Sequence, residues 1–140
     1  MKLSLVIPCY NEQDNIIPFF EETAKAFKEL PKEVKSLEMI FINDGSSDLT
    51  SQKLKDLYAS YPSVVSVVEF SRNFGKEAAM LAGLRHASGD FITIIDADLQ
   101  QRPEIVVNMV KHLLENEDCD MVAAYQDKRN EGKFMSFMKQ

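Results

Sequence analysis

Two carboxylates follow an apolar run of the chain, in the sequence DADLQ at residues 96–100. Asp96 and Asp98 are two positions apart, so both side chains can face one crevice once the chain has left the pleat of a strand. Carboxylate oxygens are hard ligands that suit Mg²⁺ or Mn²⁺, with a substrate diphosphate completing the coordination shell. In the alternative interpretation Asp96 caps a turn and Asp98 is solvated. The pair alone is compatible with both.

The overall charge restricts the partners that such a site could have. The 140 residues carry a net charge of -6, and the isoelectric point is near 4.9. Nucleic acids are usually bound by a basic face, so this balance argues against a DNA or RNA partner. Any other anionic ligand would need a cation to assist its binding. Cys9 and Cys119 form neither a C-x-x-C pair nor a disulfide framework, which favours a reducing compartment.

Five short apolar runs recur along the chain. They are nearly unbroken rather than alternating, which is typical of parallel strands that are buried on both faces. Successive runs begin about 30 residues apart, the size of a βαβ unit. The sequence therefore predicts one doubly wound α/β domain with a mainly parallel sheet. The runs are LSLVI from Leu3, LEMIFI from Leu37, VVSVV from Val64, FITII from Phe91 and MVAA from Met121.

Helical patterns separate these runs. Apolar side chains at spacings of three or four predict amphipathic helices, and Pro103 suits the first turn of the last one. The third, GKEAAMLAGLRHA at residues 75–87, is rich in alanine and glycine and can pack close to the sheet. The expected apolar stripes are Ile16, Phe20, Ala24 and Phe27 in the first helix, Leu54, Leu57, Tyr58 and Tyr61 in the second, and Ile105, Met109 and Leu113 in the fourth.

A polar motif follows each of the first four runs. Ligands of doubly wound sheets bind beyond the carboxyl ends of the strands, where the strand order reverses, so we expect the motifs to meet there. Four such motifs at one edge are hard to explain as turns alone. They are PCYNE at residues 8–12, NDGSSD at residues 43–48, SRNFGK at residues 71–76 and DADLQ at residues 96–100.

The first two motifs contain side chains that suit a nucleoside. Tyr10 could stack on a base, beside the rigid Pro8. A carboxylate at Asp44 could accept a hydrogen bond from a base imide or amine and so discriminate between bases. The alternatives are structural: Glu12 is a first-turn helix carboxylate favoured by the helix dipole, and residues 45–48 form a tight turn that caps the next helix.

The third motif supplies cations. Arg72 and Lys76 suit phosphate oxygens, and Gly75 between them allows close backbone approach. The alternative is an exposed loop with basic residues. Two other nucleotide-binding or phosphoryl-transfer classes lack their motifs here: a dinucleotide-dependent oxidoreductase needs G-x-G-x-x-G after the first strand, and a phosphatase or receiver domain needs aspartates there, whereas the first aspartate is Asp14.

Together the motifs resemble those of family 2 glycosyltransferases with the GT-A fold, in the branch that moves a sugar from a nucleotide sugar to a polyprenyl phosphate. The resemblance covers nearly the whole chain. Many relatives carry two aspartates before the Gly-Ser of the second motif, whereas this chain has Asn43 and Asp44. The matching segments are LSLVIPCYNEQDNI, FINDGSSDLT, SRNFGKEAAMLAGLRHASGD and DADLQQRPE.

The resemblance implies a role for each matching residue. It places the nucleotide sugar, UDP- or GDP-linked, against Pro8, Tyr10, Glu12, Asp44 and Asp96. It assigns the Mg²⁺ or Mn²⁺ cofactor to Asp98, Asp96 and Gln100. It assigns the reacting phosphates, and hence catalysis, to Asp96, Asp98, Arg72 and Lys76.

The implied reaction is transfer with inversion. A lipid phosphate acceptor is already an anion and needs no strong general base, whereas a saccharide hydroxyl acceptor would require a carboxylate base beyond Gln140. A noncatalytic module that binds nucleotide sugars stays an alternative, because every visible motif serves the donor.

The resemblance also concerns the ends of the chain. Residues 1–140 would be the N-terminal, donor-binding part of one catalytic domain, with the acceptor region and membrane helices absent. GKFMSFMKQ, residues 132–140, resembles the start of an interfacial helix whose lysines and apolar residues suit an anionic membrane surface, or else a helix packed on other protein. No apolar run approaches the roughly 20 residues that span a bilayer. We expect a soluble fragment that works on the cytoplasmic side of the membrane, as a monomer or an oligomer.

Overall fold

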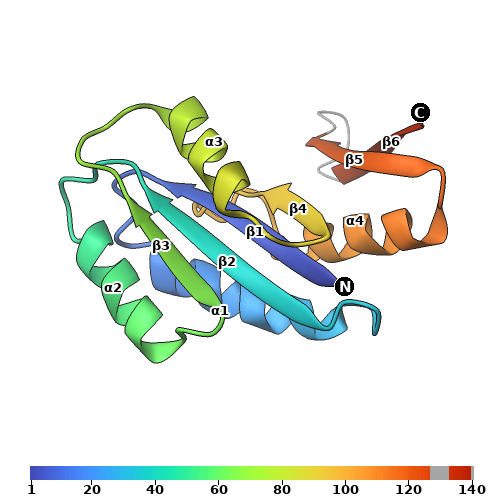
Figure 1. The fold of residues 1–140 in the computed structure, drawn as a ribbon, viewed down its shortest axis with the longest axis horizontal. Helices are drawn as coiled ribbons and strands as arrows, with labels where there is room; N and C mark the ends of the chain where they lie inside the picture. The colour runs from blue at the N-terminus through green and yellow to red at the C-terminus, as the bar shows by residue number, and fades with distance from the viewer. Residues whose placement is uncertain (127–132, 140) are drawn as a thin grey trace.

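A parallel four-stranded sheet forms the centre of the molecule (Figure 1). The computed structural model describes residues 1–126 and 133–139, with side chains described through Ala123. The strand order is β3-β2-β1-β4, which confirms the doubly wound α/β fold with a mainly parallel sheet. The elements are β1 (Lys2–Cys9), α1 (Ile16–Ala26), a short 3-10 helix η1 (Phe27–Glu29), β2 (Ser36–Asn43), α2 (Thr50–Ser60), β3 (Val65–Glu69), α3 (Lys76–His86), β4 (Phe91–Ile94), α4 (Pro103–Glu115), β5 (Cys119–Gln126) and β6 (Lys133–Lys139).

β1 lies between β2 and β4 and pairs in parallel with both. Every residue from Leu3 to Cys9 is buried, as the unbroken apolar run predicts for a strand covered on both faces. The edge strand β4 differs, because its residues alternate between half-buried and exposed, and Ile92 and Ile94 are exposed. The chain leaves β1 toward β2 and β3 and returns on the other side as β4. The strand order therefore reverses beside β1.

Helices cover both faces of the sheet (Figure 1). α1, α2 and α4 cover one face, where their apolar side chains pack on Leu3, Leu5 and Ile7 of β1. On the other face, Ala79 of α3 packs on Val6, Ile40 and Ile42. A Cβ added to Gly83 would lie 2.2 Å from Val6 Cγ1, so α3 approaches the sheet as closely as its alanine- and glycine-rich sequence predicts.

The helices are where predicted, but three of the predicted stripes need correction. The first stripe was wrong at Ala24, which is exposed, and at Phe20, which is only half-buried. In the second, Leu54 and Leu57 are buried, whereas Tyr58 and Tyr61 are exposed. The predicted stripe of α4, Ile105, Met109 and Leu113, is only half-buried and lies beside the buried face of the helix. The residues that face the core are Ile16, Phe19, Thr23 and Ala26 in α1, and Pro103, Val106, Val107 and Val110 in α4.

The fifth apolar run does not join the main sheet. It forms β5, which pairs antiparallel with β6 in a separate two-stranded sheet. The predicted interfacial helix at residues 132–140 is therefore wrong over Lys133–Lys139, where pairing with β5 provides backbone hydrogen-bond partners in an extended chain. Gly132 and Gln140 lie outside the described residues. Among the helices that the structure describes, none combines the length and apolar character needed to cross a membrane.

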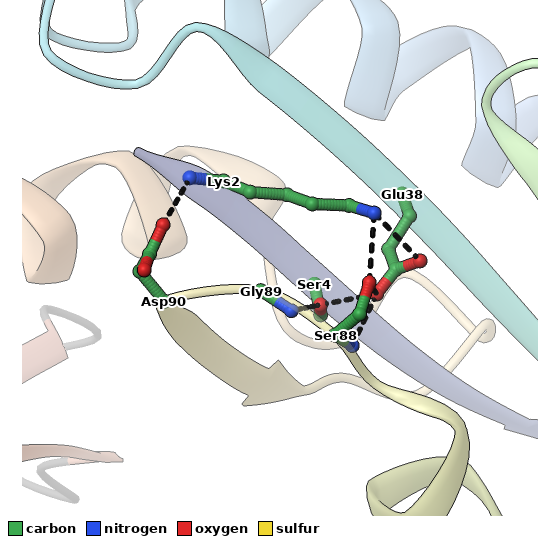
Figure 2. A network of polar contacts seen from close by, with 6 residues as sticks. All are labelled: Lys2, Ser4, Glu38, Ser88, Gly89 and Asp90. Carbon is green, nitrogen blue, oxygen red and sulfur yellow. Dashed lines mark hydrogen bonds and ion pairs between the residues drawn. The ribbon is translucent and has the colours of Figure 1, made fainter.

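A polar network fixes the start of β4 at the amino end of the sheet (Figure 2). The carboxylate of Glu38 accepts hydrogen bonds from Ser4 Oγ at 2.6 Å and from the Ser88 N–H at 2.7 Å, and it pairs with Lys2 Nζ at 3.3 Å. The next residues are held too, because the Gly89 N–H donates to Ser4 Oγ at 2.8 Å. The Asp90 carboxylate accepts the N–H of Lys2, also at 2.8 Å. The network thereby joins the α3–β4 connection to β1 and β2.

These contacts change the acidity of Glu38. Burial by itself raises the pKa of this carboxyl, but the hydrogen bonds from Ser4, from Ser88 and from Lys2 outweigh burial and lower the pKa from 4.5 to about 2. Between pH 4.5 and about 2 the folded protein thus keeps Glu38 ionised, whereas the unfolded chain would protonate it. Its stabilising contribution is complete above the unfolded pKa and is lost as the pH falls through the folded pKa.

We expect Glu38→Gln to lower the free energy of unfolding near neutral pH, with a deficit that shrinks as the pH falls from 4.5 to about 2. Urea unfolding of both proteins across that window measures the difference. Glu22→Gln, at an exposed position of α1, is the matched control and should show no such convergence. Parallel pH profiles for wild type and Glu38→Gln would contradict the role of the network.

Candidate functional site

A cleft of about 340 Å³ opens at the carboxyl ends of β1, β2 and β4. This is the edge at which doubly wound sheets bind ligands, beside the strand where the order reverses. Residues from all four polar motifs reach the cleft, although the motifs are widely separated in sequence. The lining residues are Pro8, Cys9, Tyr10, Glu12, Asp44, Asn73, Gly75, Lys76, Asp96 and Asp98.

Lys76 and Asp96 form an ion pair within the cleft. Lys76 is the first residue of α3, and Asp96 follows the end of β4. The Nζ atom of Lys76 lies 2.8 Å from Oδ1 and 2.9 Å from Oδ2 of Asp96. The side chains keep 59% and 34% of their surface exposed, so the pair is open to solvent. Two residues predicted to meet the same phosphates are thus in contact.

Asp44 is buried and joins two of the motifs. Its Oδ1 accepts the N–H of Phe74 at 2.8 Å, and its Oδ2 accepts the N–H of Gly75 at 3.1 Å. The side-chain amide of Asn73 donates to Oδ2 at 3.3 Å. The carboxylate therefore holds the loop that leads into α3. An ionised carboxylate has about four acceptor sites, so these three donors leave capacity for one more.

Gly45 lets the same two loops approach closely. Its φ of 67° lies in the left-handed region, and a Cβ there would lie 2.2 Å from the carbonyl carbon of Arg72 and 2.3 Å from the nitrogen of Asn73. Only glycine meets both conditions without displacing the neighbouring loop. The neighbouring Asn43 donates from Nδ2 to Glu69 Oε2 at 2.8 Å, a contact that a second aspartate could not make. The departure at Asn43 thus matches its pairing with Glu69 at the ends of β2 and β3.

The first motif presents Tyr10 and Glu12 to the cleft. Tyr10 is 49% exposed, so its ring is accessible to a ligand. Asn11 takes a positive φ of 52° and links this loop to the second motif, since its N–H donates to Ser46 Oγ and its side-chain oxygen accepts the N–H of Ser47, both at 2.9 Å. Glu12 Oε2 accepts the side-chain amide of Asn15 at 2.6 Å.

The alternative structural role of the second motif is also present. Asp48 Oδ1 accepts the N–H of Thr50, the first residue of α2, at 2.9 Å, although the N-cap position is Leu49 and no side chain caps the helix there. Burial alone would raise the pKa of Asp48, but hydrogen bonds from Thr50 and Gln13 lower it below its usual range. The motif therefore builds a turn with residues 45–48 and leaves Asp44 for the cleft.

The fourth motif turns sharply after Asp98. Oδ1 of Asp98 accepts the N–H of Gln100 at 3.1 Å, and Leu99 between them takes a φ of 65°. A leucine in this left-handed conformation is strained, and such strain is often found at functional sites. The side chain of Leu99 packs against the core, which holds the turn. Gln100 is exposed and is not among the residues that line the cleft.

Arg72 also lies apart from the cleft lining. Its guanidinium carbon stands 4.1 Å from the centre of the Phe74 ring, a cation–π contact. Asn73 reaches the cleft instead and bonds to Asp44. Sequence reasoning missed Asn73 and Cys9 as lining residues. Their positions inside two polar motifs were the only signal in the sequence.

The electrostatics of the cleft are dominated by carboxylates. Burial raises the pKa of the Cys9 thiol strongly, and the charges of Glu12 and Asp96 raise it further. Of the lining residues, four are acidic and Lys76 alone is basic. Among the residues that the structure describes, no group of three or more His, Cys, Asp or Glu could hold a metal ion. Two hard oxygen ligands at Asp96 and Asp98 do fit Mg²⁺ or Mn²⁺ when a diphosphate supplies further oxygens.

Comparison with known proteins gives the arrangement a context. A bactoprenol glucosyl transferase of Shigella phage SfV is 47% identical over 133 residues, which are 93% of this chain and 40% of the phage protein. A dodecaprenyl-phosphate galacturonate synthase of Rhizobium johnstonii is 34% identical over 135 residues, 96% of this chain and 39% of that protein. The chain thus spans about 40% of the length of these curated relatives.

Solved structures share the fold. The mannosyltransferase PcManGT from Pyrobaculum calidifontis, in complex with GDP-Man and Mn²⁺, superposes with a TM-score of 0.66 and 26% identity over 92% of this chain and 36% of that one. TarS 1-349 of S. aureus gives a TM-score of 0.61 at 23% identity, over 84% of this chain and 33% of that one. The family model described as Glycosyl transferase family 2 matches residues 4–139, so the chain belongs to this family.

Proposed function

We propose that the chain forms the donor-binding part of a glycosyltransferase catalytic domain, which moves a sugar from a nucleotide sugar to a polyprenyl phosphate. The observation that carries the proposal is the convergence of Tyr10, Asp44, Lys76, Asp96 and Asp98 on one cleft at the reversal of strand order. Its volume of about 340 Å³ is within the range of small-ligand sites. Two relatives named for bactoprenol and for dodecaprenyl phosphate support the acceptor class.

The nucleoside is assigned to the part of the cleft that the first two motifs form. Pro8, Tyr10 and Glu12 line it, Tyr10 offers an accessible ring for stacking, and Asp44 keeps acceptor capacity for the base. We assign a UDP- or GDP-linked donor, and the complex of PcManGT with GDP-Man supports a nucleotide sugar as the ligand.

The diphosphate is assigned to the other end of the cleft. Asp96 and Asp98 would hold Mg²⁺ or Mn²⁺, with Gln100 as the proposed third ligand, and Mn²⁺ in the PcManGT complex supports such a cofactor. The bound ion would neutralise charge on the departing nucleoside diphosphate. Lys76 and Arg72 would bind phosphate oxygens, Lys76 from within the cleft and Arg72 from outside its lining.

A polyprenyl phosphate acceptor would need no strong general base among the cleft residues. A polyprenyl phosphate is already an anion at neutral pH, so its oxygen can attack the anomeric carbon from the face opposite the leaving group and invert it. The acceptor is a membrane lipid, so the reaction would take place at a membrane surface, on the cytoplasmic side. The remaining parts of the longer relatives would supply the acceptor region and membrane attachment.

A chimera tests the reaction. Residues 1–139 joined to the part of the Shigella phage relative that follows its matched region should transfer radiolabelled sugar from a nucleotide sugar to undecaprenyl phosphate with Mn²⁺. The 140-residue chain alone should bind the donor and transfer little, because loss of acceptor positioning can forfeit about 7 to 11 kcal/mol of barrier reduction. The intact phage protein is the positive control. A folded chimera that binds donor yet transfers nothing across a donor panel would favour a noncatalytic binding module.

Asp98→Asn should weaken binding of the nucleotide sugar only when Mg²⁺ or Mn²⁺ is present, because it removes a charged metal ligand and nearly preserves shape. Thermal stability should change little. Calorimetric titrations with and without Mn²⁺ measure the effect, and Asp56→Asn, on α2 where Asp56 accepts a hydrogen bond from Gln52, is the matched control. Equal donor affinity for wild type and Asp98→Asn in Mn²⁺ would remove Asp98 from the metal site.

Asp44→Ala should weaken binding of the preferred nucleoside diphosphate by about 1 to 3 kcal/mol and narrow the discrimination between bases. The change in discrimination between bases is the decisive measurement, because Asp44 also holds the loop at residues 73–75. Loosening of the loop at residues 73–75 would lower affinity for UDP, GDP and CDP equally, whereas loss of a base contact reduces only the preferred one. Titration of all three ligands against both proteins separates these effects. An unchanged order and ratio of affinities would leave Asp44 as a purely structural residue.

A further inference from the structure

Lys76 contacts both carboxylate oxygens of Asp96. Its Nζ lies 2.8 Å from one oxygen and 2.9 Å from the other, so the ammonium group stands between them. A divalent cation bound by Asp96 would have to approach the same two oxygens. It would also be repelled by an ammonium group only a few ångströms away. Lys76 and a divalent cation are therefore competitors for Asp96.

We propose that Lys76 is a built-in counter-ion of Asp96 that keeps divalent cations from the cleft until a nucleoside diphosphate arrives, when the diphosphate attracts Lys76 and the cation takes its place on Asp96. This inference rests on the proposed function, because it concerns the order in which the donor and its cation enter the same cleft. It goes further by assigning Lys76 a second role, in control of cation binding.

The backbone around Lys76 is held, so the exchange involves the side chain. Asp44 accepts the N–H groups of Phe74 and Gly75, the two residues before Lys76. α3 begins at Lys76 and is fixed to the sheet by the close contact of Gly83 with Val6. The flexible four-carbon stem of lysine can swing from this fixed Cα. The Nζ atom can then leave Asp96 without any change in the fold.

Breaking the ion pair costs the protein little. The side chain of Lys76 is 59% exposed and that of Asp96 is 34% exposed, and ion pairs in such settings contribute little to stability because water competes for both partners. A diphosphate offers several strong acceptor oxygens to the released ammonium group. The ion pair can thus occupy Asp96 in the absence of a ligand and break when a diphosphate binds Lys76.

The charges around the pair explain why the cleft needs such a counter-ion. Glu12, Asp44, Asp96 and Asp98 line the cleft, and Lys76 is the one basic residue in its lining. Without Lys76 the site would attract any free divalent cation, because carboxylates draw cations to a concave surface. With Lys76 in contact with Asp96, Asp98 is the predicted carboxylate ligand that is left without a cationic partner among the described residues. Cation binding then depends on the oxygens that the diphosphate brings.

Direct measurement of Mn²⁺ binding, with and without nucleotide, tests the proposal. Lys76→Met keeps the length of the side chain and removes its charge, Lys76→Ala removes both, and Lys76→Arg keeps the charge. Free Mn²⁺ is measured by its electron paramagnetic resonance signal, first with protein alone and then with saturating UDP or GDP. Lys55→Met, at an exposed position of α2, is the matched control.

We expect Lys76→Met and Lys76→Ala to bind Mn²⁺ without nucleotide at least fivefold more tightly than wild type, at the low end of ordinary coupling between ligands. The enhancement of Mn²⁺ affinity by nucleotide should be large in wild type and Lys76→Arg and smaller in the two neutral variants. Equal or weaker Mn²⁺ binding by both neutral variants, measured on folded protein, would overturn the inference while leaving the proposed function intact. If wild type bound neither UDP nor GDP with Mn²⁺, the proposed function and this inference would fall together.

Discussion

The parallel pairing of β1 with both β2 and β4 is the constraint on which the cleft depends. Because β1 is flanked on both sides, the chain must leave its carboxyl end toward β2 and later return beside it as β4. The crossovers diverge here, because α1 and α2 lie on one face of the sheet and α3, which leads to β4, lies on the other. The crevice that this arrangement leaves beside β1 stays open. Pro8, Asp44 and Asp96 meet there although they are far apart in sequence, since each follows or ends one of three adjacent strands.

Two carboxylates of the β2 region hold α3 at its two ends. Asp44, just beyond β2, accepts the N–H groups of Phe74 and Gly75 before the helix. Glu38, near the start of β2, accepts the N–H of Ser88 after it. Between these contacts Gly83 brings the helix onto Val6 and Ile42. The position of α3 along the sheet is fixed at three points.

The same two contacts place the ion pair. α3 carries Lys76 at its first residue, and the connection after α3 leads through β4 to Asp96. An error in the position of the helix would move Lys76, and a shift in the register of β4 would move Asp96. The network around Glu38 sets that register, because it joins Ser88 and Gly89 to the first residues of β1. Hydrogen bonds at the amino end of the sheet thus determine geometry at its carboxyl end.

The sequence predicted the four strands of the sheet because each is a compact apolar run, although burial on both faces is found mainly in the central strands β1 and β2. It predicted less well which helical side chains face the core. Phe19 and Phe20 are adjacent and equally apolar, so only the packing of α1 on Phe41 decides that Phe19 is buried. The pairing of β5 with β6 could not be predicted, because the mixed lysine and apolar pattern of residues 133–139 suits a helix face as well as a strand.

For the site, the sequence identified which motifs converge but not how their side chains are used. Lysine and arginine both bind phosphate, yet Lys76 reaches the cleft and Arg72 stacks on Phe74. The hydrogen bonds of Asp44 to main-chain N–H groups leave no pattern of residue types at all. Contacts to the backbone depend on where a loop passes, and that is decided by long-range folding.

The acidic residues of the cleft and the Lys76–Asp96 ion pair together restrict which ligands the cleft can bind. A strongly basic cleft would bind many phosphate compounds, because unpaired positive charge attracts anions of any shape. Here the lining carboxylates repel a bare anion, and the ammonium group of Lys76 is already engaged by Asp96. A ligand must bring both negative phosphate oxygens for Lys76 and, with its cation, positive charge for Asp96 and Asp98. The cleft is therefore complementary to a diphosphate together with its metal ion, and less so to either alone.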